Sequence, residues 1–98
     1  MKIEFRRSGG FAGLSVRLEL DSAALPPGER EALEGLIARA RFFELPSARA
    51  GSRPDAFQYD LAIEREGLRH AICLGEGEAP SEIRPLLVRL VEMARRGS

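Results

Sequence analysis

The chain has 98 residues, 44% hydrophobic and 31% charged, which is the composition of one globular domain rather than a disordered tail. Fifteen basic and fifteen acidic residues cancel, so we expect neither nucleic acid nor a membrane surface as a partner, because both need a net basic field. The single cysteine excludes an internal disulfide and a cysteine-rich zinc site. No apolar run approaches the ~18 residues of a membrane span, and the N-terminal segment lacks a signal-peptide core, so we expect a cytoplasmic protein.

The N-terminal quarter predicts a β-hairpin. Residues 2–7 alternate, with Ile3 and Phe5 on one side and charged residues on the other, and a second alternating run covers residues 16–20. A period of two is typical of a strand with one buried face. The connection, SGGFAG at residues 8–13, contains three glycines and predicts a bulged turn. A phosphate-binding loop is disfavoured, because such loops lead into a helix and this one leads into a strand.

A helix is predicted next. Asp21-Ser22 ends the strand, and Leu25-Pro26-Pro27-Gly28 leads into a segment whose apolar residues recur at helical spacing. Phe42, Phe43 and Leu45 are expected to close one end of the core before Pro46 stops the helix. The apolar stripe consists of Leu33, Leu36, Ile37 and Ala40.

The second half repeats this order of elements. Residues 47–55 are polar, contain Gly51 and Pro54, and predict an exposed loop. Two alternating runs follow, residues 57–64 and 68–74, joined by Glu66-Gly67, which predicts a tight hairpin. In this reading Leu68, His70, Ile72 and Leu74 share the core face. The last helix is expected to begin near Pro85, and its inner side would carry Ile83, Leu86, Leu87, Leu90, Val91 and Ala94.

The predicted order is therefore ββαββα. The simplest arrangement is an α+β fold in which two helices pack on one face of a four-stranded antiparallel sheet, forming a single domain over residues 1–98. The opposite face of the sheet would carry mixed charge, which favours a solvated surface over a buried dimer interface. Its charged residues would be Lys2, Glu4, Arg6, Arg17, Glu19, Asp60 and Glu64.

No catalytic set emerges from the residues, so we expect no enzymatic activity, no cofactor and no bound metal. His70 is the only histidine and shares the core phase of a strand, which favours a packed role over a catalytic one. Cys73 points to the other face, so the two cannot jointly bind zinc. The carboxylates of Asp55, Asp60 and Glu64 could bind a hard cation, but carboxylates on an open strand face are usually solvated.

Two apolar residues lie in conformationally restricted segments. Phe11 lies among glycines, where its side chain either tucks back over the core or stays exposed as a binding anchor. Leu25 precedes two prolines, where it either packs at the entry of the helix as a hydrophobic staple or is presented to a partner.

Four stretches in this order resemble the emfourin family: KIEFRRSGGFAG at the start, ARFFELP from Ala40 to Pro46, FQYDLAIE from Phe57 to Glu64, and IRPLL from Ile83 to Leu87. Only SGGFAG and ARFFELP are distinctive by themselves. Emfourins are small bacterial protein inhibitors of protealysin, a thermolysin-like zinc metalloprotease. The resemblance therefore implies a reversible inhibitor that occludes the active-site cleft of such a protease. Because the mixed charge of the open sheet face favours a solvated surface, we expect a monomer when the protein is free.

Under this resemblance, the candidate contacts are the residues of the stiffened loops, because a restrained loop loses less entropy on binding. The primed pockets of thermolysin-like proteases favour Leu or Phe, so Phe11 and Leu25 are the candidate anchors. The loop at residues 47–55 would form the adaptable rim. The predicted partner-binding residues are Gly10, Phe11, Ala12, Leu25, Pro26, Arg49, Ser52 and Arg53. The alternative is a protein-binding or oligomer-forming module unrelated to proteases.

Overall fold

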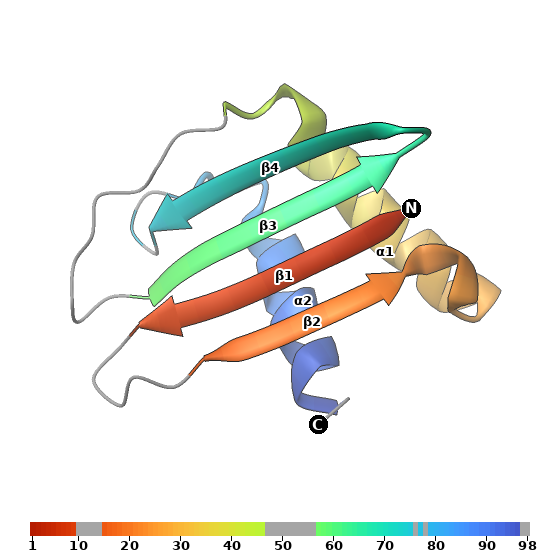
Figure 1. Cartoon of the computed structure of the whole chain (residues 1–98), viewed down its shortest axis with the longest axis horizontal. Helices are drawn as coiled ribbons and strands as arrows, with labels where there is room; N and C mark the ends of the chain where they lie inside the picture. Colours follow the sequence, from red (N-terminus) through yellow and green to blue (C-terminus); the bar gives the residue numbers. More distant parts are fainter. Residues whose placement is uncertain (10–14, 47–56, 76, 78, 97–98) are drawn as a thin grey trace.

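The computed structural model describes residues 1–9, 15–46, 57–75, 77 and 79–96, and the order of its elements follows the sequence prediction (Figure 1). Within these residues the elements are β1 (Lys2–Gly9), β2 (Val16–Asp21), the 3₁₀ turn η1 (Ser22–Ala24), α1 (Pro27–Ala40), the 3₁₀ turn η2 (Phe42–Glu44), β3 (Phe57–Arg65), β4 (Leu68–Gly75) and α2 (Arg84–Arg96).

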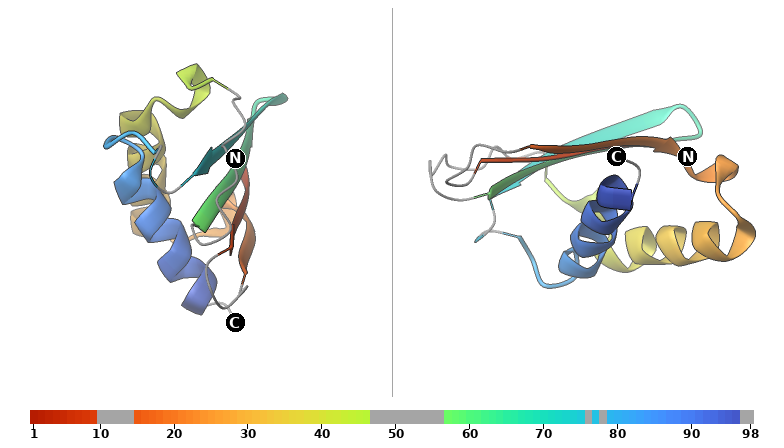
Figure 2. Two further views of the ribbon diagram at one scale, coloured as in Figure 1. Left: turned by 90° about the vertical axis from the view of Figure 1, so that its left-hand side faces the viewer. Right: turned by 90° about the horizontal axis from the view of Figure 1, so that it is seen from below.

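The four strands form one antiparallel sheet in the order β2-β1-β3-β4. Both helices lie against the same face of this sheet and cross each other, so the opposite face is open (Figure 2). The prediction of an α+β fold, with two helices on one face of a four-stranded sheet, is confirmed. The N- and C-terminal hairpins are joined through the central pair β1–β3, which the sequence pattern did not specify.

The core lies between the sheet and the helices. Alternation along the central strands sends Ile3 and Phe5 of β1, and Leu61 and Ile63 of β3, toward the helices. The side chains of β2 that share this face are only half-buried, because β2 is an edge strand. Ile72 of β4 is buried on the same face. The helices, the turn η2 and the turn before α2 supply the other large buried residues, which are Leu33, Ile37, Phe42, Ile83, Leu86, Leu87 and Leu90.

The hairpin between β3 and β4 has the tight turn that Glu66-Gly67 predicts. Both residues have positive φ, 52° at Glu66 and 81° at Gly67. Positive φ at both central positions defines the type I′ turn, whose twist matches that of the flanking strands. Leu68, predicted to share the core face, is instead 73% exposed. It directly follows this turn and pairs with the exposed Arg65, so it lies at the tip of the sheet.

The helix α1 ends earlier than the sequence suggests. Its last residue is Ala40, and Arg41 takes the left-handed conformation, with φ 50° and ψ 48°. The Arg41 amide donates back to the Ala38 and Ile37 carbonyls, which closes the helix. Phe42 then enters the core from the turn η2. Pro46 therefore does not stop the helix; the left-handed residue does.

The helix α2 begins at Arg84, and Pro85 occupies its first turn, where a missing N–H requires no partner. A separate turn precedes it, in which the Ile83 amide donates to the Pro80 carbonyl at 3.1 Å. This confirms the predicted division of the segment near Pro85. In the described part of the chain, no helix is both long and apolar enough to cross a membrane.

Candidate functional site

Six of the predicted contact residues, Gly10, Phe11, Ala12, Arg49, Ser52 and Arg53, lie outside the described residues. The structure does describe the points where their segments join the sheet. Gly9, the last described residue before the 10–14 segment, pairs with Phe57, the first described residue after the 47–56 segment. At the same end of the sheet, Gln58 pairs with Gly75. The two segments chosen from the sequence are therefore attached side by side to one end of the sheet (Figure 1), which we call the loop end.

Aromatic contacts reinforce the strands at the loop end. The guanidinium of Arg7 lies 4.3 Å from the centre of the Phe57 ring, a cation–π contact between β1 and β3. One step inward, the rings of Phe5 and Tyr59 stack with their centres 6.2 Å apart. Both contacts join the central strands directly behind the attachment points, so those points have a rigid base.

The other two predicted contacts, Leu25 and Pro26, lie at the opposite end of the sheet. They follow η1, which begins one residue after Asp21, and Asp21 pairs with Lys2 at the start of β1. Seven residue steps separate Lys2 from Gly9, which corresponds to ~23 Å along a strand. The structure therefore does not bring Leu25 to the loop end.

Leu25 itself is half-buried and packs against the hydrophobic core, whereas Pro26 is exposed. The Leu25 amide donates to the Ser22 carbonyl at 3.1 Å, which closes the turn η1. The Ser22 hydroxyl donates to the Glu34 carboxylate on α1 at 3.0 Å. Of the two alternatives left open for Leu25, this geometry favours packing over presentation to a partner.

His70 holds the chain near the other attachment of the 47–56 segment. Its Nε2 lies 2.6 Å from the carbonyl oxygen of Leu45, to which it donates. Its ring packs edge-on against Phe42, with the ring centres 5.3 Å apart. The cluster extends to Phe43, and the guanidinium of Arg65 lies 4.5 Å from the centre of that ring. His70 is thus a packed residue that fixes the end of η2 onto β4.

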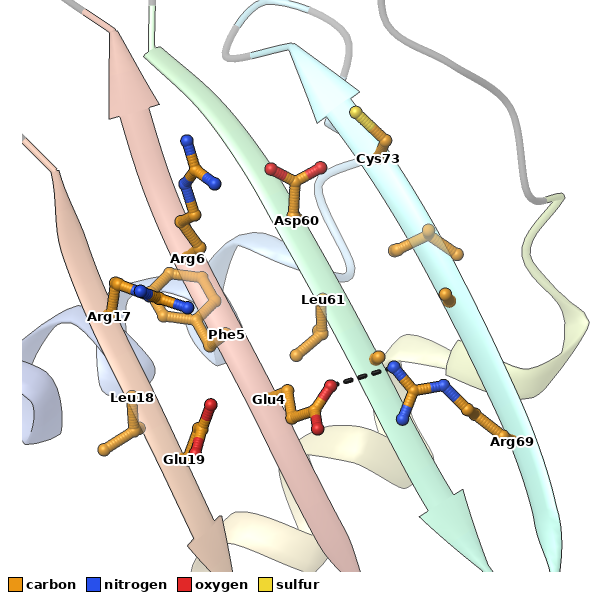
Figure 3. A pocket seen from close by; sticks show the side chains of 13 residues that line it. Glu4, Phe5, Arg6, Arg17, Leu18, Glu19, Asp60, Leu61, Arg69 and Cys73 are labelled. Atoms are coloured by element: carbon orange, nitrogen blue, oxygen red, sulfur yellow. Dashed lines mark hydrogen bonds and ion pairs between the residues drawn. The ribbon is translucent and has the colours of Figure 1, made fainter.

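The open face of the sheet is the other surface that could be functional. Figure 3 shows the side chains that line its central hollow, and the volume of this hollow is about 340 Å³. Small side chains form the floor of this hollow, because Ala62 of β3 lies beside Ala71 of β4. Like charges are paired on neighbouring strands, Glu4 with Glu19 and Arg6 with Arg17. Such pairs are unfavourable unless other charges compensate them.

Arg69 supplies part of this compensation. Its guanidinium reaches from β4 over β3 to the Glu4 carboxylate on β1, with an N–O distance of 2.8 Å (Figure 3). The small side chain of Ala62, which pairs with Glu4, leaves room for this crossing. The hydrogen bond and the charge of Arg69 lower the pKa of Glu4, and the same contact raises the pKa of Arg69. This face therefore forms its own ion pair and is exposed to solvent.

The described residues of these two surfaces form no recognisable metal site. Among the described residues, no group of three or more His, Cys, Asp or Glu side chains converges to hold a metal. Cys73 lies on the open face, and its Sγ accepts a hydrogen bond from Gln58 Nε2 at 3.1 Å. Sequence reasoning missed the Glu4–Arg69 pair, because it joins strands that are neighbours only through β3, and the strand order was unknown.

Comparison with known proteins identifies the family to which this chain belongs. The emfourin family profile matches residues 5–91, a span that begins in β1 and ends in α2. Among solved structures, the chain is similar to emfourin from Serratia proteamaculans, an M4 family peptidase inhibitor, with 20% sequence identity and a TM-score of 0.45 over 99% of this chain and 88% of that one. A search of curated proteins found no match. Because the family profile covers nearly the whole chain, the resemblance predicted from the sequence is confirmed, and the chain belongs to the emfourin family.

Proposed function

We propose that this chain is a reversible inhibitor of a thermolysin-like zinc metalloprotease and that it acts by occluding the active-site cleft. The observation that carries the proposal is the family match over residues 5–91. Inhibition is the activity that the emfourin resemblance implies. An inhibitor of this kind needs no catalytic group of its own, since it only has to bind the cleft more tightly than substrate does.

The loop end is the surface that we assign to the protease. Two segments join the sheet there, at the paired residues Gly9 and Phe57: the glycine-rich segment that contains Phe11 and the loop predicted to form the adaptable rim. The Arg7–Phe57 and Phe5–Tyr59 contacts stiffen the strands behind them. A stiff base lowers the entropy lost on binding, and this loss is a major cost of protein association.

Of the two candidate anchors, we favour Phe11. Leu25 is half-buried against the core at the far end of the sheet, so its side chain already contributes to the fold. Phe11 belongs to the segment that follows Gly9 at the loop end. An apolar anchor in a protease pocket is typical of the residues that dominate binding energy.

The test is peptide hydrolysis by a protealysin-like metalloprotease, titrated with this protein, with thermolysin as a second target. We expect stoichiometric and reversible loss of activity, with the inhibitor intact on a gel. Phe11→Ala should weaken inhibition by roughly 30-fold or more, the loss expected for a dominant interface residue. Leu68→Ala is the matched control, because it shortens an exposed apolar residue at the far tip of the β3–β4 hairpin.

The outcomes separate the parts of the proposal. No inhibition at micromolar concentration, or rapid cleavage of the protein, would rule out the inhibitor function. Unchanged inhibition by a folded Phe11→Ala variant would reject the anchor while leaving the function in place. Leu25→Ala should chiefly lower thermal stability, so a selective loss of inhibition would move the contact surface to the opposite end of the sheet.

A further inference from the structure

The exposed side of α2 carries a surface that neither the fold nor the proposed inhibition accounts for. Leu36, Pro85 and Val88 line a hollow of about 580 Å³ between α1 and α2. On the other side of Val88, Tyr59 and Val91 help line a hollow of about 350 Å³ between α2 and the sheet. We call these two adjoining hollows the α2 groove; both sides share Arg84, Val88 and Glu92.

Val88 is the exposed hydrophobic residue that marks this groove as a candidate binding surface. It is 58% exposed, and among the described residues only Val88 and Leu68 are large hydrophobic side chains exposed to this degree. Leu68 stands at a hairpin tip, next to the exposed Arg65 and Arg69. Val88 instead has apolar neighbours on both sides, so a partner that covers it would also bury the exposed parts of Leu36 and Val91.

The charges around the groove have one predominant sign. Among the described residues that line it, Arg84, Arg89 and Arg95 of α2 and Arg7 of β1 are basic, and Glu92 is acidic. The described lining residues are therefore richer in arginine than in carboxylates, whereas the chain as a whole has a net charge of zero.

Part of this positive charge is not neutralised by the groove itself. Arg89 lies 3.8 Å from Glu92, which is the only acid among the described residues that line the groove, and this pair is partly exposed. Arg84 has no ion-pair partner within the part of the chain that the structure describes. A carboxylate of a partner could therefore pair with the Arg84 guanidinium, next to the apolar lining residues Pro85 and Val88.

We propose that the α2 groove is a second protein-docking surface, and that its occupant is an acidic segment of a partner protein that inserts aliphatic side chains on either side of Val88. Apolar hollows would accept the aliphatic side chains, and the surrounding arginines would pair with the carboxylates. This proposal does not rest on protease inhibition. Arg7 and Tyr59 also support the loop end, but the residues varied in the test below, Val88 and Arg84, lie on α2 and outside the surface assigned to the protease.

Two other occupants fit the groove less well. A second copy of the chain docked groove to groove would place like charges against each other, since a two-fold interface uses the same patch on both subunits. An anionic membrane would be attracted by the same arginines, but it would leave the hollows on both sides of Val88 unfilled, and vesicle binding is therefore one outcome of the test.

The probe for the test is a fluorescein-labelled, capped peptide of about twelve residues, built from Glu and Leu at helical spacing. Its charge-reversed control contains Lys in place of Glu. Fluorescence anisotropy should show binding of the acidic peptide only, and the affinity should fall as salt is raised. In methyl NMR spectra, the largest shifts should fall on Val88 and Val91.

Three variants link this binding to the groove. Val88→Glu and Arg84→Glu should each weaken the acidic peptide by about tenfold or more, because each places a carboxylate where the peptide docks. Leu68→Glu is the matched control and should bind like the parent, since it adds the same charge at the other exposed hydrophobic residue. Circular dichroism and urea unfolding verify that all three variants are folded; Val88→Thr, which keeps the shape of the side chain, provides a second test if Val88→Glu does not fold.

The proposal is overturned if both peptides bind equally, or if the variants of Val88 and Arg84 bind the acidic peptide as the parent does. It is also overturned if sedimentation shows a dimer that Val88→Glu dissociates, or if the protein binds phosphatidylserine vesicles through Val88. Protease inhibition is measured separately on the same variants. Its loss or retention therefore tests the inhibitor function without deciding the docking surface.

Discussion

The two faces of the sheet differ in chemistry, although the same four strands form both. The face under the helices is apolar, and side chains such as Ile3 and Ile63 are 1% and 0% exposed there. The open face carries both signs of charge, and its strongest feature is the Glu4–Arg69 ion pair at 2.8 Å. Burial of apolar surface is the dominant stabilising term in folding, whereas exposed ion pairs contribute little. We therefore expect stability to depend mainly on the covered face and the open face to be tolerant of substitution.

The largest expected effect comes from shortening an apolar side chain on the covered face. Ile63→Ala should lower the free energy of unfolding by about 2–5 kcal/mol, because it removes fully buried methyl groups and leaves a cavity. Leu68→Ala, on the neighbouring strand, should change it by less than about 0.5 kcal/mol, since Leu68 is 73% exposed. Urea unfolding followed by circular dichroism measures both. Equal losses in the two variants would mean that the core is not where the structure puts it.

The faces themselves could be predicted from the sequence, because a period of two is enough to assign a side to Ile3, Phe5, Leu61 and Ile63. The same rule was wrong for Leu68, which is exposed. Alternation predicts the face toward which a side chain points, but not whether the helices extend far enough to cover it. The end of α1 was also missed. Proline was the visible stop signal, but the backbone turned left-handed at Arg41, a residue type that gives no such warning.

Contacts across the sheet could not be predicted, because they depend on strand order as well as on alternation. Glu4 and Arg69 are far apart in sequence and meet only because β3 lies between β1 and β4. The location of the candidate site residues could not be predicted either, because it also depends on how the strands are arranged. Leu25 was expected in an extended entry to the helix, and its backbone is extended, but composition could not show that it lies at the opposite end of the sheet from Gly9.

An intermediate effect is expected for a polar contact at the margin of the covered face. His70→Phe would keep a ring against Phe42. It would remove the hydrogen bond from His70 Nε2 to the Leu45 carbonyl oxygen, which are 2.6 Å apart. The loss should be about 1–2 kcal/mol, because a partly buried carbonyl would lose its partner. Thermal unfolding measures the loss, and His70→Gln, which can still donate a hydrogen bond, should recover part of it. If His70→Phe is as stable as the parent, the hydrogen bond contributes nothing to the fold.

The smallest effect belongs to the equivalent polar contact on the open face, and pH can isolate it. Arg69 lowers the pKa of Glu4 below its ordinary value of 4.5. A carboxylate whose pKa is lower in the folded state stabilises the fold above the unfolded-state pKa, and this stabilisation is lost as the pH falls through the folded-state value. Glu4→Gln should therefore be slightly less stable than the parent near pH 6, and the difference should shrink as the pH falls below about 4.5.

Matched urea titrations at several pH values measure this difference and cancel contributions common to both proteins, including that of Asp21, whose pKa is also lowered. Glu31→Gln is the control, because Glu31 is an exposed carboxylate on α1 with no ion-pair partner within the described residues. Arg69→Gln should reproduce the behaviour of Glu4→Gln, and the double variant should add little to either, since both substitutions remove the same contact. A pH-independent difference would assign the effect of Glu4→Gln to packing on Ala62 rather than to charge. The open face would then be stabilised in the same way as the covered one, and the contrast between the faces would disappear.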